Sequence, residues 1–458
     1  MKLVNKIRDV LLILMPAVLF FSFHPVIALG TDNYMNFELS LPEIWLLAFF
    51  FVNLPEIKKL AKFYGLKKTA IAFVLPIYFS LSIIWSANRT RAILTCGIFW
   101  LLVFAALNII YMLKTKPKMQ ATLQKSLLIS AAAVSVFCLL QCALDLAGIS
   151  QKYTLMCDGC TYKMFGFPHP NGFAIEPQFM GNLLLAPALF CLYLLTTKKY
   201  IFKKPLAQII ISVLIITVLF LTLSRGAIYA FLVAAAIQQI YLLAKHKKSI
   251  LKSTSLVIVS FIIALSMQGF FAAISKTSDT FYSGITKSIH QLSLGRIDLR
   301  PQAVETSSTE NTTEESRFSG YVAESTDTRV NLNSLAIKTW ASSPKYLIVG
   351  TGLGSAGIAI NNYAPSEIGP KEIVQNEYAS LLLETGLLGY VIVLVIATYA
   401  IKKADKKSKS APLLFSILLG FALTLLFFSG LPNALHIYLF PLLFVSTAKH
   451  HAVVAKKV

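Results

Sequence analysis

The stretch that decides the fold is QIIISVLIITVLFLTLSRGAIYAFLVAAAIQQIYLLAK, residues 208–245. Two apolar runs flank Ser224-Arg225-Gly226, and lysines follow the second run. A helix of about 20 residues, at about 1.5 Å per residue, crosses a hydrocarbon core of about 30 Å. Alternating ten-residue segments typical of an outer-membrane barrel are absent, so the stretch predicts a pair of transmembrane helices.

The same pattern recurs along the whole chain. Its 458 residues are 56% hydrophobic and 14% charged, whereas soluble domains carry about 25% charged residues. We therefore predict an all-α polytopic membrane protein with about 12 transmembrane helices. The predicted spans cover residues 10–30, 38–54, 69–87, 92–113, 126–148, 172–196, 205–223, 226–244, 250–274, 377–400, 411–429 and 433–447.

The formal net charge of +21 has a topological explanation. If residue 1 lies in the cytoplasm, most of the 42 basic residues fall in cytoplasmic segments, and the short outside loops keep few of them. This asymmetry predicts a multi-pass protein of the cytoplasmic membrane with both termini inside, and it suits contact with anionic membrane lipids rather than nucleic acid. The basic cytoplasmic segments are 2–8, 58–68, 114–125, 198–204, 245–252, 402–409 and 449–457.

The chain divides into three regions. Residues 1–275 hold about nine spans, residues 276–375 form one long extracytoplasmic loop, and residues 376–458 hold about three spans. The first span lacks a small-residue cleavage site, so we interpret it as retained rather than as a signal peptide.

The long loop has two parts of different character. Residues 303–328 are rich in Ser, Thr and Glu, which predicts disorder. Residues 328–340 place Val330, Leu332, Leu335, Ala336 and Trp340 at near-helical spacing, so the loop is expected to contain a short amphipathic helix.

Two motifs in the outside segments carry weak signals. Gly352-Leu-Gly354-Ser-Ala-Gly357 matches a dinucleotide-binding pattern, but it lies outside the cell and returns to the membrane at once, so a glycine turn that allows close backbone approach is the better interpretation. Cys157 and Cys160 suggest a loop-bracing disulfide or half of a metal site, while the cysteines within spans are expected to act as small hydrophobes.

Two arginines at the outer end are candidates for anion binding. Arg225 occupies a tight outside turn, and Arg329 precedes the amphipathic helix. The planar guanidinium offers five donors and keeps its charge, which suits a diphosphate. The alternatives are an arginine reaching lipid headgroups for Arg225 and a solvated loop charge for Arg329.

Four ionisable residues are candidates for proton transfer or for a wet cavity. His169 and Glu176 lie just before or at the start of a span, and either is a possible general base. Glu377 and Glu384 are seven residues apart, so on a straight helix they share a face about 10 Å apart. The alternatives are a loop histidine, a structural pairing of Glu176 with an arginine such as Arg225, and hydrogen bonding of Glu384 within the bundle.

These motifs, in their order and sidedness, resemble the O-antigen ligase and O-antigen polymerase-like membrane glycosyltransferases. The family shows a Ser-Arg-Gly turn after a long span, an Arg ahead of an amphipathic helix, and a Pro…Gly-x-Gly turn. Its loop closes on His-Asn-x-Tyr/Leu followed by Glu-x-Gly-Leu-Leu-Gly. The matching residues here are Ser224 to Gly226, Arg329, Pro344, Gly350 to Gly354, Asn376, Tyr378, Glu384 to Gly389, and the Gly166…Pro170-Asn171 segment.

The resemblance implies transfer of a glycan from a polyprenyl diphosphate carrier to a glycan or lipid acceptor, with no nucleotide sugar and no metal or other cofactor. It implies that Arg225 and Arg329 bind the diphosphate, and that Asn376 and Tyr378 belong to the substrate site. Gln375 stands where ligases have the His proposed as base, and a neutral amide does not accept a proton. We therefore expect Glu176, Glu377 or His169 to serve as the base, which favours a polymerase or another relative over a strict ligase.

A transporter or flippase of a lipid-linked glycan is the alternative. Twelve spans with both termini inside are common in transporters. Such proteins usually show repeats between their halves, and none is evident here. An enzyme releases the carrier as free polyprenyl diphosphate, whereas a flippase only relocates it.

Overall fold

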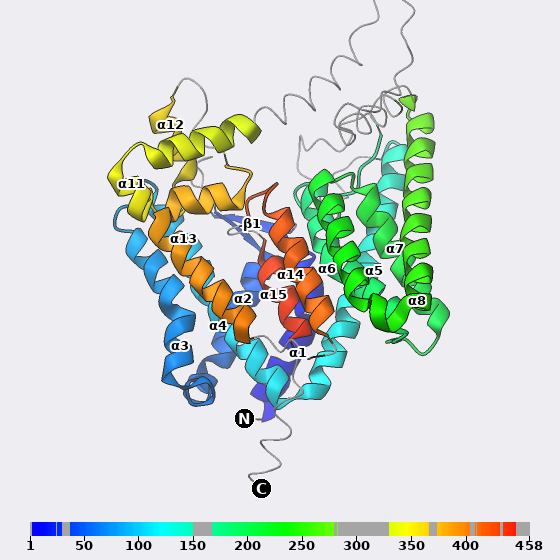
Figure 1. Ribbon diagram of the computed structural model, residues 1–458, viewed down its shortest axis with the longest axis horizontal. Coiled ribbons are helices and arrows are strands. Elements are labelled where there is room, and N and C mark those ends of the chain that lie inside the picture. Colours follow the sequence, from blue (N-terminus) through cyan, green and yellow to red (C-terminus); the bar gives the residue numbers. More distant parts are fainter. Residues whose placement is uncertain are drawn as a thin grey trace, which may run out of the picture.

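The computed structural model describes residues 2–23, 25–29, 37–149, 167–278, 282, 329–365, 373–403, 408, 410–430 and 434–445. Long helices run side by side and form the bundle (Figure 1). The N-terminus lies at one end of the bundle, and α11 and α12 lie at the other. Cys157, Cys160 and residues 303–328, on which predictions were made, fall outside the described residues.

A helical segment lies within every predicted span. Several helices begin with proline, which fits the first helical turn because its missing N–H has no partner there. The elements in order are α1 (Lys2–Leu19), β1 (Val26–Leu29), β2 (Phe37–Ser40), α2 (Leu41–Asn53), η1 (Leu54–Glu56), α3 (Ile57–Ser82), α4 (Arg89–Thr115), α5 (Pro117–Leu146), α6 (Pro177–Thr197), α7 (Pro205–Leu221), α8 (Arg225–Ile274), a helix over residues 329–341, α11 (Pro344–Val349), α12 (Ala356–Tyr363), α13 (Glu377–Lys403), α14 (Ala411–Thr424), α15 (Leu435–Leu439) and η3 (Phe440–Phe444).

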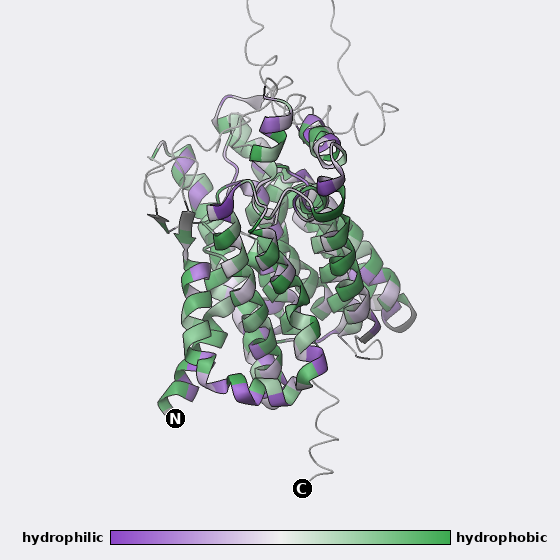
Figure 2. Cartoon of the chain, turned by 90° about the vertical axis from the view of Figure 1, so that its left-hand side faces the viewer, coloured by the Kyte–Doolittle hydropathy of each residue, from purple (hydrophilic) through white to green (hydrophobic). Residues whose placement is uncertain are grey.

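The helices have the length and composition of a polytopic membrane protein. Among the described residues, 6 helical stretches are long and apolar enough to cross a membrane. Hydrophobic residues dominate the middle of the helices, and hydrophilic residues gather toward their ends (Figure 2). Three shorter apolar stretches accompany them. The predicted number of about twelve membrane crossings stays a prediction.

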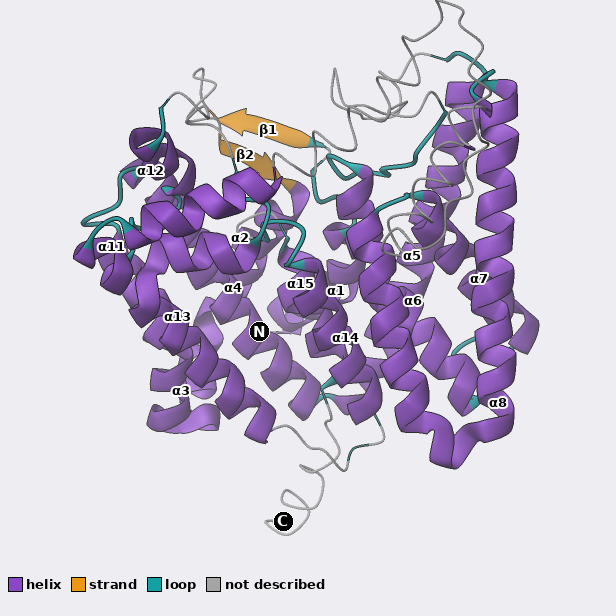
Figure 3. Ribbon diagram, turned by 45° about the horizontal axis from the view of Figure 1, so that its top comes forward, coloured by secondary structure: helices purple, strands orange, loops and turns teal. Residues whose placement is uncertain are grey.

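A two-stranded hairpin interrupts the region predicted as the first two spans, so the expectation of an all-α protein is wrong here. α1 ends at Leu19, and β1 pairs antiparallel with β2, with Val26 opposite Ser40 (Figure 3). Pro25 opposes any continuation of helix through the residues just before it, because proline has no N–H to donate and disfavours helical backbone at the preceding residue. Ser40 and Glu43 then form a capping box that starts α2.

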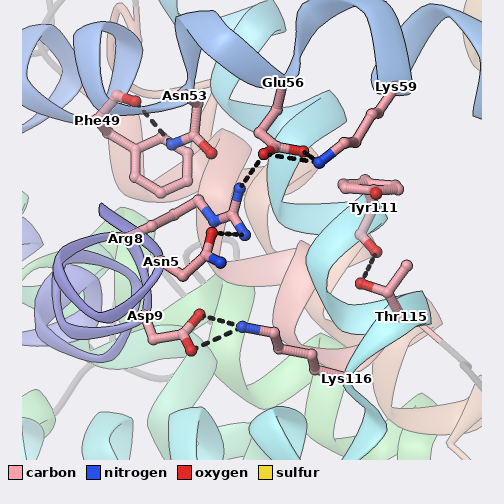
Figure 4. A network of polar contacts seen from close by, with 10 residues as sticks. All are labelled: Asn5, Arg8, Asp9, Phe49, Asn53, Glu56, Lys59, Tyr111, Thr115 and Lys116. Atoms are coloured by element: carbon pink, nitrogen blue, oxygen red, sulfur yellow. Dashed lines mark hydrogen bonds and ion pairs between the residues drawn. The ribbon is translucent and has the colours of Figure 1, made fainter. Parts of the chain in front are cut away.

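The end of the bundle near the N-terminus is tied together by ion pairs (Figure 4). Lys116 lies 2.7 Å from Asp9, and Arg8 lies 3.4 Å from Glu56, which also pairs with Lys59 at 3.1 Å. These contacts join α1 to η1 and to the α4–α5 connection, all within segments predicted to face the cytoplasm.

α6 is the central helix of the bundle. It packs against α7, α8 and α14, and 89% of an apolar 18-residue stretch of it is buried. α13 packs on the other side of the molecule, against α3 and α11. The start of α6 is therefore held on several sides, and this is where the candidate site begins.

α13 is broken at Gly386. Gly386 has a φ of 62° and lies outside helical geometry, so the segment before it leaves carbonyl groups without partners in the helix. The backbone N–H groups of Thr351 and Gly352 donate to the carbonyls of Leu383 and Glu384, each at 2.9 Å. The glycine turn thereby closes the end of the first half of α13.

The predicted glycine turn is confirmed in its geometry. Gly350, Gly352 and Gly354 all have positive φ, and a Cβ on Gly352 would lie 2.3 Å from the Cα of Ser86. The segment before the turn, which looks like a strand in sequence, is helix α11. Without a preceding strand, the glycines do not form a dinucleotide-binding unit.

Replacement of Gly352 by Ala should destabilise the protein by about 2–4 kcal/mol, because the new methyl group meets backbone atoms and the backbone is left-handed. The measurement is thermal unfolding of the detergent-solubilised protein. Gly97→Ala is the matched control, since Gly97 lies within α4 and a Cβ there meets nothing within 4 Å. Equal melting temperatures for the two variants would contradict the close packing of the turn.

Candidate active site

A turn after α14 gathers the starts of three helices. Gln178 on α6 donates to the Phe427 carbonyl at 2.9 Å. A Cβ on Gly226, at the start of α8, would lie 3.0 Å from the Phe427 side chain. Ser429 and the Gly430 N–H donate to the Glu377 carboxylate, at the start of α13, at 2.9 and 2.6 Å. Helix N-termini carry partial positive charge, which at α13 is met by the Glu377 carboxylate, so the starts of α6 and α8 are the ones left to favour an anionic ligand.

Arg225 is the first residue of α8 and its side chain is exposed. The Ser224 hydroxyl caps the helix by accepting from the Ala227 N–H at 3.4 Å. Gly181 on α6 allows close approach here, because a Cβ on it would lie 2.8 Å from that of Ala227. The Ser-Arg-Gly sequence thus places an exposed arginine on a tightly packed helix start, in a turn predicted to face outward.

Arg329 lies at the start of the helix over residues 329–341, in the segment where an amphipathic helix was predicted. Leu332, Leu335 and Ala336 are buried as expected, whereas Val330 is 63% exposed and does not belong to the buried face. Val330 therefore points away from the side of the helix that packs against the protein.

Glu176 precedes α6 and lies within electrostatic reach of Arg329. Burial raises the pKa of the Glu176 carboxyl above its ordinary value, and the Arg329 charge opposes this shift. The side chain still opens to the surface on its outer side. Arg329, rather than Arg225, is the arginine whose charge acts on Glu176, and direct pairing of the two side chains stays a prediction.

The residues at the start of α13 have defined structural contacts. Asn376 caps the helix, accepting from the N–H groups of Tyr378 at 3.0 Å and Ala379 at 3.2 Å. The Tyr378 hydroxyl donates to the Ala422 carbonyl at 2.8 Å, which joins α13 to α14. Gln375 is half-buried just before them. Contact of these residues with substrate stays a prediction.

Glu384 has a structural position that the sequence did not reveal. It was expected about 10 Å below Glu377 on one straight helix, but Gly386 breaks α13 directly after it. Its carboxylate accepts the Ala356 N–H at 3.1 Å and the backbone groups of the preceding turn. Glu384 therefore caps α12, which matches the alternative of hydrogen bonding within the protein.

His169 and Asn171 lie in the connection between α5 and α6. Asn171 donates to the Ala174 carbonyl at 2.8 Å and accepts from Gln141 on α5 at 3.3 Å. The His169 side chain is 3% exposed, and its ring lies 4.8 Å from that of Phe167. In this conformation an acceptor hydroxyl does not reach His169, so it is a weaker candidate for the base than the two carboxylates.

A small cavity of about 40 Å³ adds a residue that sequence reasoning missed. Arg91, in the first turn of α4, lines it together with Glu377 and Glu384. The signal that could have pointed to Arg91 is the scarcity of basic residues in the short segments predicted to lie outside. The remaining lining residues are Thr95, Gly354, Ala356, Gly357, Ile373, Val374, Ser380, Leu381 and Ser429.

The described residues offer no metal site. Within them no three His, Cys, Asp or Glu side chains lie close enough together to hold an ion. Cys96, Cys138, Cys142 and Cys191 are free of disulfides and buried, and Cys96 also lies within hydrogen-bonding distance of Ser80, at 3.3 Å.

Glu384→Ala should destabilise the fold by about 3 kcal/mol, because backbone donors of the 354–356 turn lose a charged acceptor in a buried place. Glu384→Gln keeps one acceptor oxygen and should lose less. Thermal unfolding in detergent measures both variants. If the alanine variant melts like the wild type, the carboxylate does not hold the turn.

Comparison with known proteins agrees with this arrangement. No curated protein sequence matches the chain. The profile of the O-antigen ligase family matches residues 210–394, about two fifths of the chain, and this region includes Arg225, Arg329 and the start of α13. This match suggests a glycosyltransferase-like membrane role in polysaccharide biosynthesis. The matched region, residues 210–394, runs from within α7 to within α13 and is similar to the O-antigen ligase family.

Proposed function

We propose that this protein transfers a glycan from a polyprenyl diphosphate carrier to an acceptor hydroxyl at the outer face of the cytoplasmic membrane, in cell-surface polysaccharide biosynthesis. Both termini would lie in the cytoplasm. The single observation that carries the proposal is the placement of Arg225 and Arg329 at helix starts within the region similar to the O-antigen ligase family.

The two arginines suit the leaving group of such a reaction. When the bond between the sugar and the diphosphate breaks, negative charge grows on the carrier. Fixed guanidinium groups and helix N-termini stabilise that charge without having to reorganise. The backbone at Arg225 is held by the capped start of α8, and the backbone at Arg329 is held by the buried face of its helix.

The acceptor hydroxyl needs a group to take its proton. The acceptor oxygen forms the new bond to the anomeric carbon, the diphosphate leaves with the bonding electrons, and the hydroxyl proton passes to a carboxylate. Glu377 and Glu176 are the two candidates, because Glu384 caps α12 and Gln375 is a neutral amide. Ser429 and Gly430 hold the Glu377 carboxylate in a fixed orientation.

Arg225→Ala and Arg329→Ala should each lower release of free polyprenyl diphosphate from a glycan-linked donor by about 100-fold or more, because each removes a charged contact to the leaving group. Lysine at either position should recover part of the rate, since it restores charge without the planar fork. The assay uses the full chain in reconstituted membranes. Lys345→Ala is the control, as Lys345 is exposed on α11. Intact carrier moved to the other leaflet without release would instead identify a flippase.

Glu176→Gln and Glu377→Gln together should abolish transfer, because no carboxylate remains to accept the proton. A base works only when ionised, so the rate of the wild type should fall as pH decreases through its pKa. If Glu176 is the base, its raised pKa places this fall above the ordinary value of 4.5, and Glu176→Gln alone abolishes transfer. Glycan transfer that persists in the double variant would exclude both residues as the base.

A further inference from the structure

We infer that the cavity between α4, α12 and α13 is a binding subsite for hydroxyl groups of the acceptor glycan, and that Arg91 is one of its ligand-binding residues. The inference rests on the proposed function and names the substrate that this second site takes. Arg225 and Arg329 lie at other helix starts and belong to the donor side.

The lining of the cavity has the chemistry of a sugar-binding surface. Glu377 accepts hydrogen bonds, Arg91 donates them, and Thr95 and Ser380 carry hydroxyl groups that do either. Sugar hydroxyls are both donors and acceptors, so they fit this mixture. Glu377, the candidate base, lies in the same lining.

The charge of the cavity argues against the diphosphate as its ligand. Two carboxylates and one guanidinium line it, so the acidic groups outnumber the cationic one. A diphosphate placed there would meet like charge, which is costly in a partly buried site. Neutral hydroxyls carry no such cost. The charges thus divide the outer surface into a cationic donor side and an acidic acceptor side.

Arg91 is held in a defined place by the glycine turn. The Arg91 backbone N–H donates to the Asn88 side chain at 3.1 Å, and this bond caps the start of α4. A Cβ on Gly354 would lie 3.0 Å from the Arg91 Cγ, so the turn lies directly against the arginine stem. Its charge acts on Glu384, and it is exposed at the surface while lining the cavity.

The size of the cavity limits what enters it. A volume of about 40 Å³ has room for a few water molecules, since one water needs about 10–15 Å³ on this measure. Single hydroxyl groups on one edge of a sugar fit, and a whole ring does not. The subsite therefore orients an acceptor whose remaining rings lie outside the protein.

The experiment measures acceptor and donor separately with the full chain in reconstituted membranes. Labelled lipid-linked glycan from the producing cells is the donor, and the unlabelled total glycolipid extract of the same cells is the acceptor probe. Arg91→Ala should raise the half-saturating amount of acceptor tenfold or more, with a smaller change in the dissociation constant of the labelled donor. Arg225→Ala should do the reverse and weaken donor binding.

Arg89→Ala is the matched control, because Arg89 lies two residues away and is exposed at the same helix start. If Arg91→Ala does not fold, Thr95→Val keeps the shape of the side chain, removes one hydroxyl from the cavity, and should raise the half-saturating amount of acceptor severalfold. The inference is overturned if Arg91→Ala, or Thr95→Val in its place, matches Arg89→Ala, or if Arg91→Ala weakens donor binding as much as Arg225→Ala. Absence of any label transfer by the wild type would instead overturn the proposed function, and the subsite with it.

Discussion

The outer half of this protein depends on the hydrogen bonds between the glycine turn and the broken helix α13. Carbonyl groups exposed by a break in a helix are costly in an apolar surrounding unless another group donates to them. The N–H groups of Thr351 and Gly352 do so, and the Glu384 carboxylate returns the contact by capping α12. Backbone and side-chain hydrogen bonds thus join α13 to the glycine turn and to α12. The position of Arg91 follows from how closely the turn packs on α4.

Charge is distributed across the outer surface in a way that suits two different substrates. The donor of the proposed reaction carries a diphosphate, and its acceptor is a neutral hydroxyl. Arg225 and Arg329 stand at helix starts, whereas Glu377 and Glu384 border a cavity that also holds Arg91. The turn around Phe427 lies between these groups, because it contacts α6 and α8 through Phe427 and α13 through Ser429 and Gly430.

The sequence was informative wherever hydrophobic periodicity or local backbone chemistry decides the structure. It located the helices, the amphipathic helix after Arg329 and the tight packing of Gly352. It did not reveal the β1–β2 hairpin, because four-residue strands carry too weak a pattern to compete with a long apolar run. It placed Glu384 on a straight helix, because a glycine within an apolar run gives no sign of its φ. Arg91 gains its neighbours only through contacts distant in sequence.

The burial of α6 has a consequence for how the protein is made. Most of the contacts of α6 are with α7, α8 and α14, which follow it along the chain, whereas α5 precedes it. A ribosome therefore delivers the central helix to the membrane before most of the helices that pack against it. Asn182, 1% exposed in the finished bundle, first faces the insertion machinery and lipid, and becomes enclosed as later helices arrive. The helices that bury most of α6 therefore reach the membrane after α6 itself.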